Sequence, residues 1–346
     1  MRKKIVVIGG GIAGMEASAF LSALRFDVTL IERKSRLGGH LLNWERLFPT
    51  MRHGSEVLNF LEQGIRENVH VLCNIEITQI IRHGNEFSVI LTNGKILEAH
   101  AILVTTGYDL FDARKKEEYG YGIYENVITS ADLETLFTQV GDIRMADGRI
   151  PKRIGMIHCV GSRDEKTGNT YCSKVCCVTA VKQAIEIRQR LPETEVFCFY
   201  MDLRMFGMHF EAMYKEAQEK YGVIFIRGRL SEACENQDQT IVAKVEDTLA
   251  GLPLKMNLDL LVLMVGFVPS EGTKKIGNML GLQFGPNRFY KTRDQHTLTN
   301  VSNVAGVFFA GACTAPKTIT HTITDARAAA ATVASYLFEH PLGRRE

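Results

Sequence analysis

The sequence predicts an α/β protein made of two Rossmann-like domains. A buried strand at residues 4–8 leads into a glycine-rich turn, and a second set of strands and helices starts near residue 152. The last quarter of the chain then returns to the pattern of the first domain. We therefore expect a discontinuous first domain, residues 1–112 and 268–346, with residues 113–267 inserted as the second.

The first domain begins with a βαβ unit. The buried strand is followed by an alanine-rich helix at 14–25 and by a strand at 28–32 that ends at Glu32. The elements expected after it are short strands over 69–105 with turns at 83–85 and 93–95, a polar linker at 112–122, strands at 259–269 and 306–312, and a long helix at 320–338.

The inserted domain alternates strands with helices. A strand at 152–161 precedes a helix at 178–191 whose apolar residues have helical spacing. A strand at 196–202 follows, then an amphipathic helix at 210–222 that stops at a glycine, then a strand at 223–228. This order predicts a parallel sheet with helices on its faces.

Composition excludes several classes of function. The chain is 45% hydrophobic and 23% charged, with a formal net charge of +2. Because it contains no long basic run, a surface that tracks nucleic acid is not expected. The longest apolar run, 260–268, is too short to cross a membrane. The basic start before an apolar run resembles a signal peptide, but its glycines and strand–turn–helix pattern favour a cytoplasmic protein.

The N-terminal turn has the pattern of a dinucleotide site. Gly9, Gly11 and Gly14 fit G-x-G-x-x-G between a strand and a helix. The first permits the tight turn, the second lets the backbone approach a pyrophosphate, and the third allows close packing of helix and strand. Glu32, 23 residues after Gly9, stands where a carboxylate accepts hydrogen bonds from ribose.

Three further features favour FAD over NAD. They are Gly38-Gly39, Thr105-Thr106-Gly107 at a strand end, and the 306–311 segment before the last helix. Together they resemble the two-dinucleotide-binding-domain flavoproteins, the group of glutathione and thioredoxin reductases. In that group an Asp usually follows the last glycine, whereas Ala312 and Cys313 follow here. Lys317 and the start of the last helix would place positive charge near the flavin ring. The expected FAD-binding residues are Gly9, Gly11, Ile12, Ala13, Gly14, Glu32, Arg33, Gly38, Gly39, His40, Ile77, Thr105, Thr106, Gly107, Gly311, Ala312, Lys317, Thr318 and Ile319.

Four of the eight cysteines fall within nineteen residues: Cys159, Cys172, Cys176 and Cys177. The spacing differs from paired zinc knuckles and from C-x-x-C. Adjacent thiolates would be strained at one ion, but they can reach different irons of a cubane, so we interpret the four as ligands of a [4Fe–4S] cluster. A Cys176–Cys177 redox disulfide and four unrelated buried thiols remain as alternatives.

Cys159 occupies the end of the strand where a nicotinamide domain would carry its glycine fingerprint. The chain reads C-V-G-S-R-D there, so we do not expect NADH or NADPH to bind in this domain. Arg163, Lys174 and Lys182 lie near the cysteines in sequence and would balance the negative charge of a cluster, as would a helix starting near Val178. Arg204 and Arg227 are expected either to do the same or to be solvated.

Longer motifs resemble the HdrA family of heterodisulfide reductase, in its shortened HdrA-like form. They include HCVGSRD (158–164), YCSKVCC (171–177), MDLRMFGMHFEAMY (201–214), FIRGR (225–229) and APKTI (315–319). The resemblance covers nearly the whole chain. It implies FAD in a thioredoxin-reductase-like core, one [4Fe–4S] cluster on the four cysteines, a homodimer, and partner subunits of the HdrB and HdrC kind that carry out the disulfide chemistry.

The chain departs from the methanogen pattern of that family, because it has no N-terminal extension and no C-x2-C-x2-C-x3-C run. Such short forms resemble those of sulfur-oxidising bacteria, where the complex oxidises sulfane sulfur in the cytoplasm. We therefore expect an electron-transferring protein with flavin and iron–sulfur cofactors. The alternatives are a stand-alone disulfide or NAD(P)H-dependent reductase and a non-catalytic scaffold.

The remaining cysteines and one histidine are expected to have packing roles. Cys73, Cys198 and Cys234 are interpreted as small buried hydrophobic residues. Cys313 falls in the flavin-facing turn, where a structural role is favoured over a reactive one. His158 should point to the face of its strand opposite Cys159.

Overall fold

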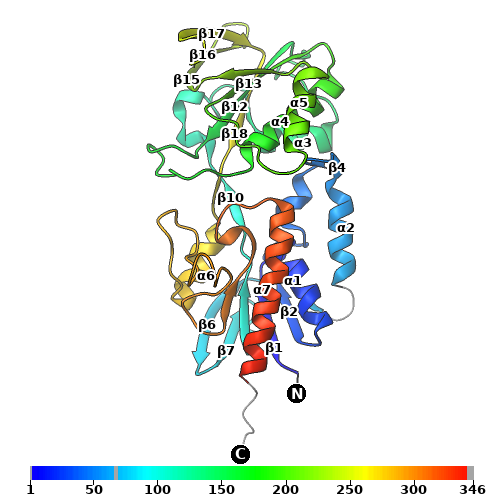
Figure 1. The fold of residues 1–346 in the computed structure, drawn as a ribbon, viewed down its shortest axis with the longest axis vertical. Coiled ribbons are helices and arrows are strands. Elements are labelled where there is room, and N and C mark those ends of the chain that lie inside the picture. The colour runs from blue at the N-terminus through cyan, green and yellow to red at the C-terminus, as the bar shows by residue number, and fades with distance from the viewer. Residues whose placement is uncertain (1, 66–68, 341–346) are drawn as a thin grey trace, which may run out of the picture. The chain divides into compact units, whose positions relative to one another are not determined.

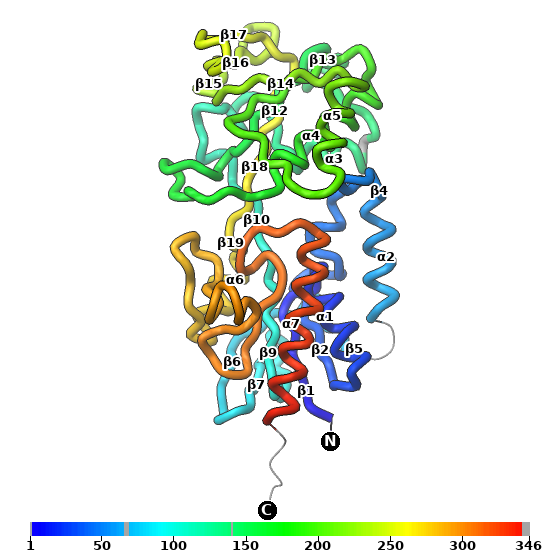
Figure 2. The backbone as a smooth tube through the Cα atoms, viewed as in Figure 1, coloured from blue at the N-terminus to red at the C-terminus, as the bar shows by residue number. Residues whose placement is uncertain are grey.

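A computed structural model describes residues 2–65 and 69–340 (Figures 1 and 2). Contacts within the chain define two compact units. Unit 1 is formed by Met1–Leu42, Ser55–Asp109 and Val268–Glu346, and unit 2 by Asn43–Gly54 and Leu110–Phe267. The first unit is discontinuous, as the sequence pattern predicts. The boundaries differ from the expected ones at residues 43–54 and 110–112, which lie in unit 2.

Unit 1 is built on a five-stranded parallel sheet. Its strands, in spatial order, are β20 (Val307–Phe309), β9 (Ala101–Val104), β1 (Lys4–Ile8), β2 (Asp27–Ile31) and β5 (Val69–Leu72). The central strand β1 is buried from its second residue onward, as expected for a strand covered on both faces. Helices α1 (Ile12–Ala23) and α7 (Ile319–Glu339) pack along each other in this unit (Figure 1).

An antiparallel sheet completes the core of unit 1. It consists of β6 (Ile77–His83), β7 (Glu86–Leu91) and β8 (Ile96–Ala99), joined by the turns expected near 84 and 94. Phe87, Val89 and Leu91 alternate inward from β7 and share one hydrophobic cluster with residues of the parallel sheet. Further elements are α2 (Gly54–Gly64), α6 (Glu271–Leu280), and the pair β10 (Tyr108–Leu110) and β19 (Phe267–Pro269), where the chain passes from one unit to the other.

Unit 2 also contains a five-stranded parallel sheet. Its spatial order is β11 (Val127–Thr129), β18 (Leu260–Val265), β12 (Arg153–Val160), β13 (Glu195–Tyr200) and β14 (Ile224–Arg227). The helices of this unit are α3 (Ser130–Thr135), α4 (Cys176–Arg190) and α5 (Phe210–Glu219). The central strand β12 is buried from Ile154 to Val160, which places the first cysteine of the group at the end of the middle strand.

A three-stranded antiparallel sheet extends unit 2, and the sequence pattern does not predict it. It is formed by β15 (Leu230–Glu235), β16 (Ile241–Asp247) and β17 (Leu252–Leu258), which lie together at the top of Figure 2. In the middle strand β16, the first three residues, Ile241, Val242 and Ala243, are all buried. The start of this strand therefore lacks the alternation of apolar and polar residues that marks a half-exposed strand in a sequence.

Residues 43–54, with β3 (Arg46–Leu47) and β4 (Arg52–His53), belong to unit 2 through charged contacts. Glu45 pairs with Arg190, and the Nε of Arg46 lies 3.9 Å from an oxygen of Glu186. Fully buried Lys182 pairs with Glu134 and, at 2.8 Å, with Glu186. The expectation that Lys182 faces the cysteines is therefore wrong, because two buried carboxylates already balance its charge.

The 112–122 segment is not a linker. It forms the short 3₁₀ turns Ala113–Lys115 and Glu117–Tyr119, and it buries both Lys116 and Tyr119 in unit 2. The hydroxyl of Tyr119 donates a hydrogen bond to the carbonyl of Leu230 at 3.2 Å. Polar composition was misleading here because the buried lysine has a buried acidic partner, Asp164, described below. No helix in the described part of the chain combines the length and apolar character that a membrane span requires.

Candidate cofactor sites

The glycine-rich turn between β1 and α1 has the geometry of a phosphate-binding loop. Gly9 has a φ of +113°, and a side chain at Gly14 would come within 1.9 Å of the carbonyl oxygen of Gly9. A Cβ at Gly11, in contrast, would meet nothing within 4 Å. Gly11 is also the N-cap of α1 and gives it no side-chain capping bond, and the first turn contains no acidic residue. The first N–H groups of the helix are thus open to an anion in front of Gly11.

Glu32 lies where the sequence places it, at the end of β2. The carboxylate is buried and accepts hydrogen bonds from the backbone of Gly10 at 2.7 Å and of Lys34 at 2.8 Å. Each carboxylate oxygen keeps a second lone pair for the hydroxyls of a ribose. A second glycine turn approaches the first, since a Cβ at Gly39 would be 3.1 Å from the Cα of Gly11. The two glycine turns, at Gly9–Gly11 and at Gly38–Gly39, therefore border the same space. This arrangement fits the binding of a dinucleotide.

The other residues expected to bind FAD in this part of unit 1 differ in burial and in their contacts. His40 stacks on Tyr108 with 4.3 Å between ring centroids, and burial lowers its pKa. Arg33 is half exposed, 3.8 Å from Glu271. The hydroxyl of Thr105 bonds to the carbonyls of Ile8 and Gly9, so it fixes the turn through its side chain. Ile77 is buried in the hydrophobic cluster of unit 1.

The turn before α7 is organised by an acid that the sequence pattern did not single out. Asp325 accepts from the backbone N–H of Gly311 at 2.7 Å and from the side chain of Asn300 at 2.9 Å. Lys317 lies 3.4 Å from the same carboxylate and donates to the carbonyl of Gly311 at 2.8 Å. The charge expected of Lys317 at a flavin ring is thus largely balanced within the protein. The helix contains several other polar residues, so the local sequence did not distinguish Asp325.

The same turn packs on the first glycine loop. A Cβ at Gly311 would come within 2.7 Å of the Cβ of Ala13 in α1. Thr318 caps α7 by accepting from the backbone N–H of His321 at 3.2 Å. Cys313 is fully buried, its thiol is 3.2 Å from the carbonyl oxygen of Ala310, and burial raises its pKa to about 12. These contacts give Cys313 a packing role.

The four clustered cysteines come together at the carboxyl edge of the unit 2 sheet. Cys159 lies in the irregular part of β12, where the register shifts between Ile157 and Val160. Cys172 lies on the loop that returns from this strand, and Cys176 and Cys177 open α4. The helix begins two residues earlier than expected at Val178, so both adjacent thiols lie in its first turn. The cap residue makes no side-chain bond to the helix, and the first turn has no acid, which leaves N–H donors for negative charge.

The thiols interact electrostatically with one another. Burial raises the pKa of Cys176, and the charges of Cys159, Cys177 and Cys172 raise it further. For Cys159, burial and then the charge of Cys177 raise the pKa to about 12, although neighbouring Arg163 opposes them. Thiolates gathered in a buried place are unfavourable unless a metal compensates them. Such a donor set is expected of a metal-bound centre.

The backbone around the thiols is unusual. Cys159, Arg163 and Lys174 all have φ values between +54° and +64°, a region that residues other than glycine rarely adopt. Such conformations persist only where the surrounding structure imposes them, and they concentrate at functional sites. Among the described residues, no group of three or more His, Cys, Asp or Glu side chains has an arrangement that could hold a metal ion.

Buried polar contacts hold the loop between Cys159 and Cys172. Asp164 bonds to the ammonium of Lys116 at 2.8 Å, and both side chains are 3% exposed. Asn169 donates to the carbonyl of Gly161 at 3.0 Å. Beyond the loop, the hydroxyl of Ser173 accepts from the backbone of Phe267 at 2.8 Å. Local sequence patterns do not reveal the roles of Asp164, Asn169 and Ser173, because the partner of each residue lies elsewhere in the chain.

We expect Lys116→Met to lower the free energy of unfolding by about 1.5–3 kcal/mol, because it removes the hydrogen bond of Lys116 to the buried carboxylate of Asp164 and leaves Arg229, 3.2 Å away, as the remaining cation. Burial raises the pKa of Asp164, but the hydrogen bond and charge of Lys116 outweigh burial and lower it overall. The stabilisation therefore holds at neutral pH and is lost as the pH falls through the lowered pKa. Urea unfolding at pH 7 measures the effect. Lys115→Met, at an exposed neighbour, is the control, and equal stability of the two variants would contradict the expectation.

The other expected residues of this region differ in burial. His158 is buried, neither ring nitrogen has a hydrogen-bond partner among the described residues, and burial lowers its pKa to about 4. This agrees with a packing role. Cys198 is fully buried, as expected, and Cys73 is partly buried. The expectation for Cys234 is wrong, because it lies exposed on β15 at the edge of its sheet.

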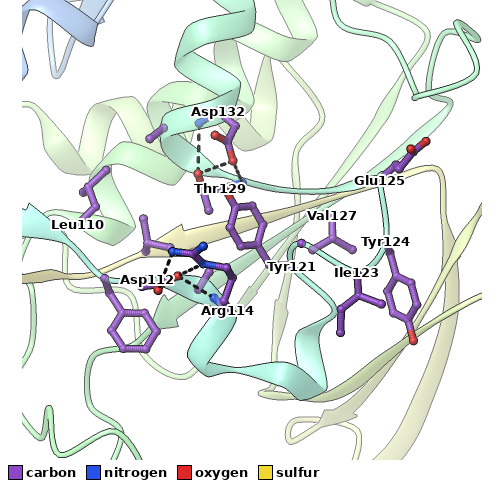
Figure 3. A pocket seen from close by; sticks show the side chains of 15 residues that line it. Leu110, Asp112, Arg114, Tyr121, Ile123, Tyr124, Glu125, Val127, Thr129 and Asp132 are labelled. Carbon is purple, nitrogen blue, oxygen red and sulfur yellow. Dashed lines mark hydrogen bonds and ion pairs between the residues drawn. The ribbon is translucent and has the colours of Figure 1, made fainter.

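A pocket of about 740 Å³ lies in unit 2 apart from these residues (Figure 3). It is lined by residues of the 110–132 segment together with Val265. Its charged and hydroxyl groups include two pairs: Arg114 with Asp112 at 2.8 Å, and Thr129 with Asp132 in a capping box. None of the residues lining it is among the expected cofactor ligands.

Comparison with known proteins places the chain in a family. Residues 1–143 match the family "Pyridine nucleotide-disulphide oxidoreductase". The HdrA component of the H(2):CoB-CoM heterodisulfide,ferredoxin reductase of Methanothermobacter thermautotrophicus is 32% identical over 96% of this chain and 63% of its own length. The iron-sulfur HdrA component of the CoB–CoM heterodisulfide reductase of Methanocaldococcus jannaschii is 32% identical over 96% of this chain and 64% of its own length. The chain belongs to the HdrA family of heterodisulfide reductases. It spans less than two thirds of these relatives.

The fold agrees with a flavoprotein of two dinucleotide-binding domains. The thioredoxin reductase of Lactococcus lactis covers 98% of this chain and is itself covered completely, with a TM-score of 0.67 and 18% sequence identity. At that identity the likeness concerns the fold alone. The predicted thioredoxin-reductase-like architecture is confirmed. The relatives are named as reductase subunits, so the chain belongs to an oxidoreductase family. The relative from Methanocaldococcus jannaschii is named an iron-sulfur subunit.

Proposed function

We propose that this chain is the electron-transferring flavin and iron–sulfur component of a heterodisulfide-reductase-like complex. One observation carries the proposal: four cysteines from a strand end, a loop and a helix start, three of them buried, lie close enough to interact, where the related fold would bind nicotinamide. FAD and a [4Fe–4S] cluster are the cofactors. FAD exchanges electrons in pairs or singly, and the cluster exchanges them singly, which lets the chain connect two-electron and one-electron partners.

The residues of the chain hold and tune these groups. The glycine turns around Gly11 receive the pyrophosphate at the start of α1, and Glu32 accepts from the ribose. Cys159, Cys172, Cys176 and Cys177 are the proposed cluster ligands. The N–H groups at the start of α4 stabilise the net negative charge of the cluster.

The chemistry on sulfur substrates is assigned to partner subunits. The sequence contains no C-x-x-C pair of the kind that carries out thiol–disulfide exchange. We propose a homodimer that works with HdrB-like and HdrC-like subunits in the cytoplasm, in the oxidation of sulfane sulfur. Support for this setting comes from the resemblance of the chain to the HdrA-like proteins of sulfur oxidisers, whose pattern likewise differs from that of the methanogen proteins.

An anaerobic redox titration tests the proposal. The purified chain is titrated with dithionite while its visible and EPR spectra are recorded. We expect the yellow flavin band to bleach and a cluster EPR signal to rise, both reversibly on reoxidation. NADPH should not bleach the flavin rapidly. Rapid stoichiometric bleaching by NADPH would contradict the proposal and favour a stand-alone reductase, and cofactors that do not respond to dithionite would favour a scaffold.

A further inference from the structure

The loop between β13 and α5, residues 201–209, covers the cysteines and is exposed on its outer side. Its inner side contacts one proposed cluster ligand: the carbonyl oxygen of Asp202 lies 3.6 Å from the thiol of Cys177, and the backbone of Arg204 bonds to the same thiol. Its outer side presents Phe206, 68% exposed, and Met208, 82% exposed. Shielding a buried centre does not require two large apolar side chains in solvent, so their exposure calls for another explanation.

Three arginines gather around Asp202 of this loop, and a lysine lies near Phe206. Arg163 donates to the carboxylate of Asp202 at 2.7 Å, while Arg204 and Arg227 lie 3.9 and 3.8 Å from the same carboxylate. The ammonium of Lys174 lies 5.9 Å from the centre of the Phe206 ring. These four cations against one carboxylate give the loop and its neighbours a local excess of positive charge.

We propose that this surface, residues 201–209 with Lys174 and Arg227, is where a small acidic iron–sulfur protein docks to exchange one electron with the cluster. The inference rests on the proposed function, since it requires the cluster. An apolar centre with a charged rim is the usual composition of a protein interface, and aromatic and Met side chains are enriched in its centre. Opposite charge across the rim accelerates encounter more than it tightens the complex, which suits a transient electron-transfer partner.

The backbone of the loop explains why docking here would be productive. A protein seated on Phe206 contacts the same nine-residue loop whose main chain touches Cys177. Only the loop then separates the partner from a cluster ligand. Because Cys176 and Cys159 are only 5% and 8% exposed, the cluster itself would not reach the surface. The surface over the loop thus gives the centre access to a protein without exposing it to solvent.

Stopped-flow kinetics with an acidic [2Fe–2S] ferredoxin as the probe tests the inference. The prereduced ferredoxin is mixed with the oxidised full chain, and the second-order rate constant is measured from low to high salt. We expect the rate of the wild-type protein to fall by about tenfold or more as salt screens the charges. Arg227→Glu should slow the reaction at low salt by about tenfold and flatten its salt dependence. Phe206→Ser should slow it while leaving the salt dependence unchanged.

Matched controls come from the β15–β17 sheet of the same unit. Leu252→Ser removes an apolar side chain that is 64% exposed, and Lys255→Glu reverses a charge on the same strand. Both should react at the wild-type rate. Every variant should be reduced by prereduced methyl viologen, a small one-electron carrier that needs no docking surface, as fast as the wild type.

The outcomes separate this inference from the proposed function. If the cluster signal is present and Arg227→Glu and Phe206→Ser react with ferredoxin like the controls, the docking surface is wrong and the proposed function stands. If no variant, including the wild type, shows a cluster, the proposed function itself fails. If sedimentation shows that Phe206→Ser converts a dimer to monomers, the surface binds a second copy of this chain and the inference is overturned.

Discussion

Replacing Cys172 by alanine will remove the iron–sulfur signal from the protein and leave it yellow. Cys172 lies on a loop, is only partly buried and accepts a contact from the backbone N–H of Lys174 at 3.3 Å. Its loss therefore costs little packing but removes one of four ligands. We expect iron to fall from about four atoms per chain to below about one. Iron and sulfide analysis with EPR measures the loss, and flavin absorbance measures what remains.

Cys234→Ala is the matched control, because that cysteine is exposed on β15, away from the four clustered cysteines in sequence. It should keep both the cluster and the flavin. A Cys172→Ala protein that retained a full cluster would refute the ligand assignment. Loss of the flavin together with the cluster would show that the change had unfolded the chain, and Cys172→Ser would then be compared at equal stability.

The second large effect concerns the flavin. Gly11→Val is expected to weaken FAD binding by about 10- to 100-fold while leaving the fold intact. A Cβ at Gly11 meets no protein atom within 4 Å, and its φ of −78° suits any residue. The added methyl groups would instead occupy the space that the pyrophosphate needs. Overpacking costs about 1–3 kcal/mol, and about 1.4 kcal/mol corresponds to tenfold in affinity. Titration of the apoprotein with FAD, followed by flavin fluorescence, gives the dissociation constants.

Gly14→Ala is the informative comparison. Its Cβ would lie 1.9 Å from the carbonyl oxygen of Gly9 and 2.9 Å from the hydroxyl of Thr105, so it disturbs the protein itself. We expect this variant to lose stability in urea, in contrast to Gly11→Val. If Gly11→Val bound FAD as tightly as the wild type, the cofactor would not approach this turn, and the assignment of the first glycine loop would be wrong.

The elements with strong local signals could be predicted from the sequence. The strand at 4–8 agrees residue for residue with β1, because a short apolar run before G-x-G-x-x-G usually forms a buried strand. The last helix, expected at 320–338, is observed at Ile319–Glu339. The cysteine spacing predicts four cluster ligands, and that assignment stays a prediction. In each case the pattern lies within a few dozen neighbouring residues.

What escaped prediction depends on partners that are distant in sequence. Lys116 looked like part of a solvated linker, and only the position of Asp164 reveals why it is buried. Asp325 supports Gly311 from within the last helix, which local pattern does not disclose. Residues 43–54 join unit 2 because Glu45 meets Arg190, a pairing across 145 positions. Ion pairs and hydrogen bonds between residues distant in sequence thus explain why the predictions for these three segments were incomplete.

Metal analysis combined with Mössbauer spectroscopy tests the central claim most directly. The full chain is expressed with ⁵⁷Fe and purified without oxygen. The account predicts about four irons and four sulfides per chain, with the Mössbauer spectrum of one cubane cluster held by thiolates. A protein that contained no sulfide and carried a Cys176–Cys177 disulfide would contradict it.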